Sequence, residues 1–306
     1  MGEIQPLQNR SLISTIFLSP SERRLRAGWR LLIQSIMLVI LSIIFGIGSS
    51  LIMLWVPIKL IPDSTTGLEI GELMEFFTIA ISVYLARRFL DKRSFASIGF
   101  EINRLIIFDI LAGIMITCIM MGSIFVAMQA LGWLKFESFA WNIDPAQTVI
   151  SQTLLFFVIF ILVGVNEELL FRGYYLQSIT SGLNLFWGLL ISSLIFGILH
   201  LGNPNATWVS AAGIFCAGLF LAYGYIRTRQ LWLSIGLHLG WNFFEGVVFG
   251  YPVSGLSIYP LMNIKVSGPQ VWTGGAFGPE AGLIILPALV LGAVLVNIYT
   301  RLRPDL

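Results

Sequence analysis

The stretch Val149–Gly173, VISQTLLFFVIFILVGVNEELLFRG, decides which kind of fold this chain adopts. Its first part, an apolar run from Val149 to Val165, supplies most of the roughly 20 residues that a membrane-spanning helix needs. The run passes directly into Asn-Glu-Glu-Leu-Leu-Phe-Arg-Gly, which carries two carboxylates and an arginine. A charged side chain inside a membrane helix costs at least about 2.5–3.5 kcal/mol, so such residues usually serve a function. The stretch therefore predicts a membrane helix that ends in a functional polar motif.

The rest of the chain has the composition of a polytopic membrane protein. Of its 306 residues, 57% are hydrophobic and 11% are charged, and the mean hydropathy is +0.86. Soluble domains carry about 25% charged residues. Eight apolar runs follow one another: Leu31–Val56, Glu69–Ala86, Leu105–Ala130, Gln147–Val165, Leu185–Leu201, Trp208–Ile226, Leu231–Phe249 and Ala281–Tyr299. We therefore expect an all-α polytopic membrane protein of about eight transmembrane helices, with a cytoplasmic tail over residues 1–30 and a single transmembrane domain over residues 31–306.

The basic residues predict the orientation of these helices. With the N-terminus inside and eight spans, 14 lysines and arginines fall on the cytoplasmic side and 3 on the opposite side, and Arg172 stays in the motif. Cytoplasmic loops are enriched in basic residues, so both termini are expected in the cytoplasm. The arginine-rich start lacks the cleavage site of a signal peptide. We expect a multi-pass protein of the bacterial plasma membrane or an equivalent organellar membrane. The exported segment 251–280 is rich in glycine and proline, which predicts an irregular loop whose role stays open.

The two carboxylates of the motif have different neighbours on a helix. Glu168 and Arg172 are four residues apart, so they lie on one face and can pair. Glu167 points about 100° away around the helix axis and stays free for chemistry. The alternative is structural, with an Arg–Glu pair that only holds helices together.

Both histidines of the chain, His200 and His238, also lie in apolar runs. His238 and Asn242 are four residues apart and share a helix face, and Glu245 follows three residues later. At 1.5 Å per residue, His200 lies about 21 Å, Glu167 about 18 Å, Asn242 about 16 Å and His238 about 10 Å from the cytoplasmic ends of their helices. All four depths fall in the middle of a hydrocarbon core about 30 Å thick. We therefore predict a polar catalytic cavity near the bilayer midplane.

A carboxylate, two imidazoles and an amide suit the activation of a water molecule in two ways. In the first, Glu167 and His200 polarise water that attacks a carbonyl, while His238 and Asn242 donate to the oxyanion. In the second, His200 and His238 bind a divalent metal with a carboxylate, most plausibly zinc, which lowers the pKa of bound water to about 7. The common zinc helix His-Glu-x-x-His is absent, which slightly favours the first chemistry.

Three motifs in this order resemble those of a known family. They are Glu167-Glu168-x-x-x-Arg172, Phe196-x-x-x-His200 and His238-x-x-x-Asn242. Each is weak alone, but together they are similar to the type II CAAX prenyl protease and bacteriocin-processing family (CPBP, or Abi) of intramembrane proteases. The resemblance covers about residues 147–250, the predicted protease-like core.

The resemblance implies a role for each motif residue. Glu167 looks like the carboxylate that activates water, and Glu168 with Arg172 looks like its support. His200 resembles the second water-activating or metal-binding residue, and His238 with Asn242 the oxyanion or second-ligand pair. Members are described both as metalloproteases and as glutamate proteases. Eukaryotic relatives cut the last three residues from prenylated proteins, and bacterial relatives are linked to bacteriocin maturation and self-immunity.

The leading hypothesis is an intramembrane endopeptidase that hydrolyses a peptide bond of a membrane-associated or lipid-modified protein or peptide. Its expected partners are membrane lipids and such a substrate, and no basic patch for nucleic acid is visible. One alternative is a non-catalytic membrane immunity or scaffold protein that uses the same fold. Another is a proton-coupled transporter, because buried glutamate and histidine also mark proton paths. The sequence leaves substrate and oligomeric state open.

Overall fold

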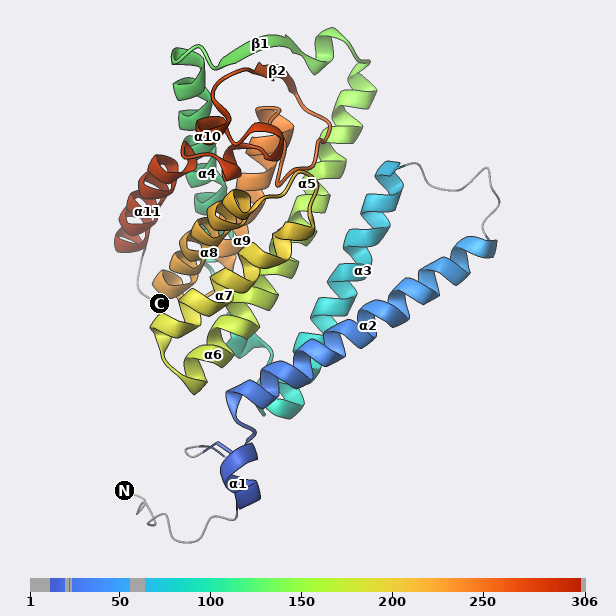
Figure 1. Ribbon diagram of the computed structural model, residues 1–306, viewed down its shortest axis with the longest axis vertical. Helices are drawn as coiled ribbons and strands as arrows, with labels where there is room; N and C mark the ends of the chain where they lie inside the picture. Colours follow the sequence, from blue (N-terminus) through green and yellow to red (C-terminus); the bar gives the residue numbers. More distant parts are fainter. Residues whose placement is uncertain (1–11, 20–21, 23, 56–63, 304–306) are drawn as a thin grey trace.

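The computed structural model describes residues 12–19, 22, 24–55 and 64–303 (Figure 1). Arg10, Arg23, Val56 and Lys59, which entered the predictions above, lie outside the described residues. The helices and strands are α1 (Leu12–Phe17), α2 (Ala27–Trp55), α3 (Ser64–Leu85), α4 (Ile106–Ala130), β1 (Leu134–Phe139), α5 (Ala146–Glu168), α6 (Leu176–Gly182), α7 (Leu185–Leu199), α8 (Trp208–Thr228), α9 (Trp232–Asn242), β2 (Met262–Val266), α10 (Gln270–Thr273) and α11 (Ile285–Leu302).

Each of the eight apolar runs forms a helix, which confirms the all-α membrane fold. Among the described residues, six helices are long and apolar enough to cross a membrane. Helices α3 and α9 fall outside this set: α3 carries glutamates in its first half, and α9 has only 11 residues of regular helix before its turns widen. A multi-pass integral membrane protein is therefore established, while the number of eight spans stays a prediction.

Helix α5 does not end where its apolar run ends. A wide-turn, π-helical segment from Leu169 to Tyr175 joins it to α6, so one continuous helix runs from Ala146 to Gly182. The depth predicted for Glu167 requires that the helix continues through the charged motif, and the structure shows this continuation. Wide helical turns of this kind are frequent at functional sites.

The arginine-rich links, which are the segments before α2, between α3 and α4, between α8 and α9, and at the end of α11, lie together at one end of the helix bundle. Three contacts join them: Arg30 with Asp91, Leu231 with Gly99, and Arg303 with Asp109. The opposite end is closed by antiparallel β1 and β2, which come from the links after α4 and after α9 (Figure 1). This arrangement agrees with the predicted alternation of the links, and the assignment of the arginine-rich end to the cytoplasm stays a prediction.

The two-stranded sheet was not predicted from the sequence. Its register pairs Leu134 with Val266 and Phe139 with Met262, with an irregularity between Phe136 and Ser138. The loop that contains β2 is irregular beyond the strand, as its glycines and prolines predict, and it includes short helical turns. The sheet and the 251–280 loop together cover the end of α9 that lies away from the arginine-rich links.

Helix α9 lies at the centre of the bundle and is held closely against α4. A Cβ atom on Gly113 would lie 2.4 Å from the backbone nitrogen of Leu237, and one on Gly236 would lie 2.4 Å from the carbonyl oxygen of Ile110. Only glycine allows such an approach, because small residues let membrane helices pack backbone to backbone. This contact fixes the depth and rotation of the helix that carries His238 and Asn242.

Helices α2 and α3 stand beside the main bundle and diverge from it toward the end where the sheet lies (Figure 1). Apolar side chains of α2 such as Val39, Ile43 and Ile47 are more than half exposed. Such exposure is expected of side chains that face lipid rather than protein. The space between this helical pair and the bundle contains the candidate site.

Candidate active site

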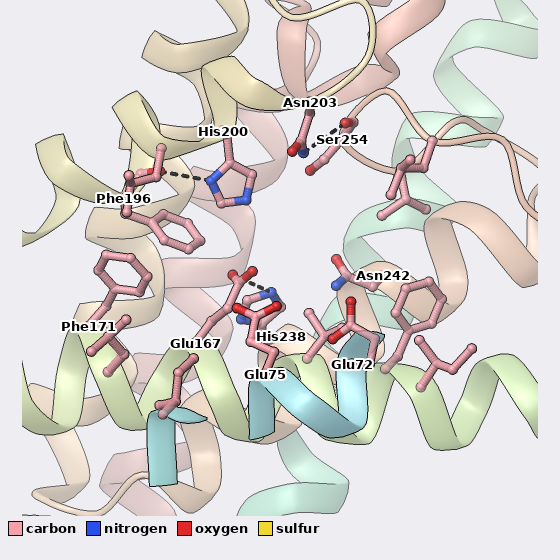
Figure 2. Close-up of a pocket in the computed structure, with 18 of the residues that line it drawn as sticks. Glu72, Glu75, Glu167, Phe171, Phe196, His200, Asn203, His238, Asn242 and Ser254 are labelled. Carbon is pink, nitrogen blue, oxygen red and sulfur yellow. Dashed lines mark hydrogen bonds and ion pairs between the residues drawn. The ribbon is translucent and has the colours of Figure 1, made fainter. Parts of the chain in front are cut away.

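A cavity of about 600 Å³ lies where the predicted site residues converge (Figure 2). Its walls come from α2, α3, α5, α7, α8, α9 and the 251–280 loop, and most of the lining side chains are apolar. Four of the six predicted residues line it: Glu167, His200, His238 and Asn242. The other two, Glu168 and Arg172, lie behind the wall and are almost fully buried. The chain thus brings together side chains that lie up to 75 positions apart in the sequence, from Glu167 to Asn242.

Glu168 and Arg172 form the predicted ion pair. Arg172 Nη1 donates to Glu168 Oε1 at 2.7 Å, and Nη2 donates to the carbonyl oxygen of Gly218 on α8 at 2.9 Å. The guanidinium is 2% exposed and the Glu168 side chain is fully buried. Two buried charges stay ionised when they are paired and hydrogen-bonded. We therefore treat Glu168 as a carboxylate held by Arg172.

His238 bridges the two adjacent glutamates, which the sequence did not indicate. Its Nδ1 lies 2.9 Å from Glu168 Oε1 and its Nε2 lies 3.5 Å from Glu167 Oε2. Because ionised Glu168 only accepts hydrogen bonds, Nδ1 must carry a proton and donate it. The contact with Glu167 is longer than the hydrogen bond to Glu168. Arg172, Glu168, His238 and Glu167 thus form a chain of contacts that ends in the cavity.

His200 lies at the end of α7, across the cavity from Glu167 and His238 (Figure 2). Its Nδ1 is 2.8 Å from the carbonyl oxygen of Phe196. A carbonyl can only accept, so Nδ1 is the donor and the neutral ring leaves Nε2 as an acceptor. The backbone thus fixes the tautomer of His200 and leaves one nitrogen for a ligand or water.

The phenyl ring of Phe196 holds the basic groups of the site in place. It contacts the ring of His200 with centroids 4.6 Å apart and that of His238 with centroids 6.2 Å apart. The guanidinium carbon of Arg172 lies 4.5 Å from its centroid, which is cation–π geometry. Phe171 packs edge-on against it from the other side. Phe196 therefore orients both histidines and contacts the buried arginine.

Asn242 offers a polar group to the cavity. Its side chain is 6% exposed, lines the cavity and makes no hydrogen bond with any described residue. Its amide carries both a donor and an acceptor for an incoming group. Glu245, which the sequence placed on or near the same face, is fully buried in the following wide-turn segment and does not line the cavity.

The site residues fit a tightly held metal poorly. No group of three or more His, Cys, Asp and Glu side chains within the described ranges is placed to hold an ion. Both ring nitrogens of His238 face carboxylates, so a metal would have to displace one of them. A structural or catalytic zinc needs at least three protein ligands. We derive no step through a metal, and the second predicted chemistry is tested below by chelation.

Sequence reasoning missed four further residues around the cavity. Glu72 and Glu75 reach it from α3, and Ser254 and Glu280 reach it from the 251–280 loop. Glu280 is fixed by three donors: Trp241 Nε1 at 3.1 Å, Ser254 N at 2.8 Å and Ser254 Oγ at 2.6 Å. The one available signal was the spacing of three between Glu72 and Glu75 in an otherwise apolar run, which places them on one helix face.

Comparisons with known proteins agree with this geometry. Residues 149–244 match the model of the family described as type II CAAX prenyl endopeptidase Rce1-like. The Bacillus subtilis (strain 168) protein named "Putative membrane peptidase YdiL" is 32% identical over 113 residues, which is 37% of this chain and 44% of that protein. An Escherichia coli protein named "Uncharacterized 24.3 kDa protein" is 32% identical over 118 residues, 38% of this chain and 53% of its own.

The chain thus spans about half the length of the curated relatives it matches. The matched segment contains every predicted site residue from Glu167 to Asn242 and the helices α5 to α9 that carry them. The part of the chain that carries these residues is similar to the Rce1-like family of type II CAAX prenyl endopeptidases, and the match covers less than half of the chain.

Proposed function

We propose that the chain is an intramembrane endopeptidase that hydrolyses a peptide bond of a membrane-associated or lipid-modified protein or peptide. The observation that carries the proposal is the chain of contacts Arg172–Glu168–His238–Glu167, which ends on a cavity that also holds His200 and Asn242. The family match supports the same class of reaction.

In the proposed reaction, water lies between Glu167 and His200 and donates one hydrogen bond to each. Glu167 takes a proton as the water oxygen attacks the carbonyl carbon of the scissile bond. The Glu167 proton then passes to the leaving nitrogen when the C–N bond breaks, so that water is added across the bond and the carboxylate is restored.

The oxyanion that forms during attack needs a donor, and in our proposal the Asn242 amide supplies it. His238 was expected to share this role, but both its nitrogens face carboxylates, at 2.9 and 3.5 Å. Loss of one oxyanion donor typically lowers kcat by about 10²–10³-fold. The Asn242 variant should therefore be slow rather than inactive.

The substrate reaches the cavity within the membrane in this proposal, which matches the apolar lining and the divergence of α2 and α3 from the bundle. Membrane lipids are then the surrounding partner. We further propose that both termini are cytoplasmic, because the arginine-rich links share one end of the bundle.

The test uses purified protein in lipid vesicles with a library of membrane-anchored peptides, some of them lipid-modified at a cysteine. We expect cleavage by the wild type, and none above background by Glu167→Ala or His200→Ala. Glu137→Ala is the matched control, because Glu137 lies exposed on β1 away from the cavity. Normal cleavage by Glu167→Ala would exclude this mechanism. An unchanged cellular phenotype of that variant would favour the immunity or scaffold hypothesis.

A further inference from the structure

Two carboxylates on α3 face the candidate catalytic residues and have no role in the proposed reaction. Glu72 and Glu75 line the cavity, and Figure 2 shows both directed toward its interior from the side of α3. We name them the acidic wall. Neither of them makes an ion pair or a side-chain hydrogen bond with any described residue.

The acidic wall differs from the other carboxylates of the cavity in lacking a partner. Glu280 has three donors, and Glu167 faces His238. The residues that line the cavity include no lysine or arginine. A carboxylate among apolar side chains stays ionised at less cost when a cation approaches it. None of the described residues that line the cavity supplies such a cation, so a molecule that binds there would have to carry it.

A second observation indicates what kind of molecule carries that cation. The Asn242 side chain is more than nine-tenths buried, has no hydrogen-bond partner among the described residues and points into the same cavity (Figure 2). An amide that both donates and accepts fits a peptide backbone, whereas a free metal ion would use only its oxygen. Glu75 is close enough to Glu167 and His200 to interact with them electrostatically. A peptide held at Asn242 would therefore bring its neighbouring side chains to the acidic wall.

We propose that the acidic wall, Glu72 and Glu75, is a specificity site that binds a lysine or arginine side chain of the substrate next to the scissile bond. This inference rests on the proposed peptidase function. The long apolar stem of such a side chain suits the apolar cavity, while its charged head reaches the carboxylates. The site accordingly selects peptides with a basic residue near the cleavage position over otherwise identical neutral or acidic ones.

The test compares peptides that differ in one side chain. A lysine is moved through the positions on either side of the scissile bond of a membrane-anchored peptide that the wild type cleaves, with methionine and glutamate at the same positions as references. At one or more positions we expect the wild type to cleave the lysine peptide at least about tenfold faster than the methionine peptide, measured as kcat/KM. In Glu72→Gln/Glu75→Gln this ratio should fall to about one.

Charge reversal keeps the test decisive if the double glutamine variant folds poorly. Glu72→Lys/Glu75→Lys should prefer the glutamate peptide over the lysine peptide, while Glu137→Gln keeps the wild-type ratio. A binding measurement with the inactive Glu167→Gln protein should show the same lysine preference without any cleavage.

The outcomes separate this inference from the proposed function. If the wild type cleaves no peptide, the peptidase proposal fails. If it cleaves lysine, methionine and glutamate peptides at equal rates, the peptidase proposal stands and the acidic wall is not a specificity site. If the double glutamine variant instead loses a bound divalent cation and keeps the lysine preference, the acidic wall is a metal site and the inference is overturned.

Discussion

Replacement by glutamine should affect the two adjacent glutamates differently. Glu168→Gln should destabilise the fold, whereas Glu167→Gln should abolish cleavage with little loss of stability. Glu168→Gln removes the charge that accepts Arg172 Nη1 at 2.7 Å and His238 Nδ1 at 2.9 Å, both on the same oxygen. Arg172 would then remain 2% exposed with no counter-ion within the described residues. Breaking a buried pair by removing one partner costs about 3–5 kcal/mol. Glu167→Gln, in contrast, removes only a 3.5 Å contact from a side chain that reaches the cavity, so its cost in stability should stay within about 1 kcal/mol.

Thermal unfolding in detergent measures this difference. For Glu168→Gln we expect a fall in Tm on the order of 5–10 °C, and for Glu167→Gln a Tm within about 2 °C of the wild type. Cleavage should disappear in Glu167→Gln even though the protein is as stable as the wild type. Equal losses of Tm in the two variants would refute the separation of a supporting and a reacting carboxylate.

Four further predictions concern the packing and ions around the site. Phe196→Leu should lower the unfolding free energy by about 1–3 kcal/mol through lost packing and the lost cation–π contact with Arg172, and should reduce kcat more than KM, as read from Tm and steady-state kinetics. Gly236→Val should lower Tm sharply, because even a Cβ would lie 2.4 Å from the carbonyl oxygen of Ile110; a wild-type Tm would argue against the close α4–α9 contact. Asp91→Asn should loosen the α2–α3 pair, because this carboxylate is the counter-ion of three buried arginines, and protease sensitivity near the ends of α2 and α3 would report it. Treatment with a zinc chelator should leave the cleavage rate unchanged; a loss of cleavage that added zinc restores would establish the metal-dependent chemistry instead.

Local helix geometry made part of the site predictable. The spacing of four residues between Glu168 and Arg172 predicted their ion pair, because residues four apart share a helix face regardless of the rest of the fold. The rise per residue and the thickness of the bilayer predicted similar depths for His200, His238 and Asn242, and these residues line one cavity, while the depths themselves stay a prediction. These inferences need only the position of a residue within its own helix.

The features of the site and fold that the sequence does not predict depend on contacts between segments far apart in the chain. The bridge from His238 to both glutamates depends on the rotation of α9, which its glycine contact with α4 sets, and periodicity alone does not reveal that rotation. No local pattern identifies Glu72 as a site residue, since nothing within its own helix shows that α3 faces the cavity. The pairing of β1 with β2 joins residues more than 120 positions apart, as Leu134 and Val266 show.

Peptide cleavage by the Glu167→Gln protein in lipid vesicles tests the proposed activity most directly. Wild type and variant would be incubated with the same membrane-anchored peptides, and both product fragments would be identified by mass spectrometry. We expect both fragments from the wild type, a loss of at least about 10³-fold in the variant, and the same Tm for the two proteins. Fragments formed at the wild-type rate by the Glu167→Gln protein would contradict the assignment of Glu167 as the group that activates water.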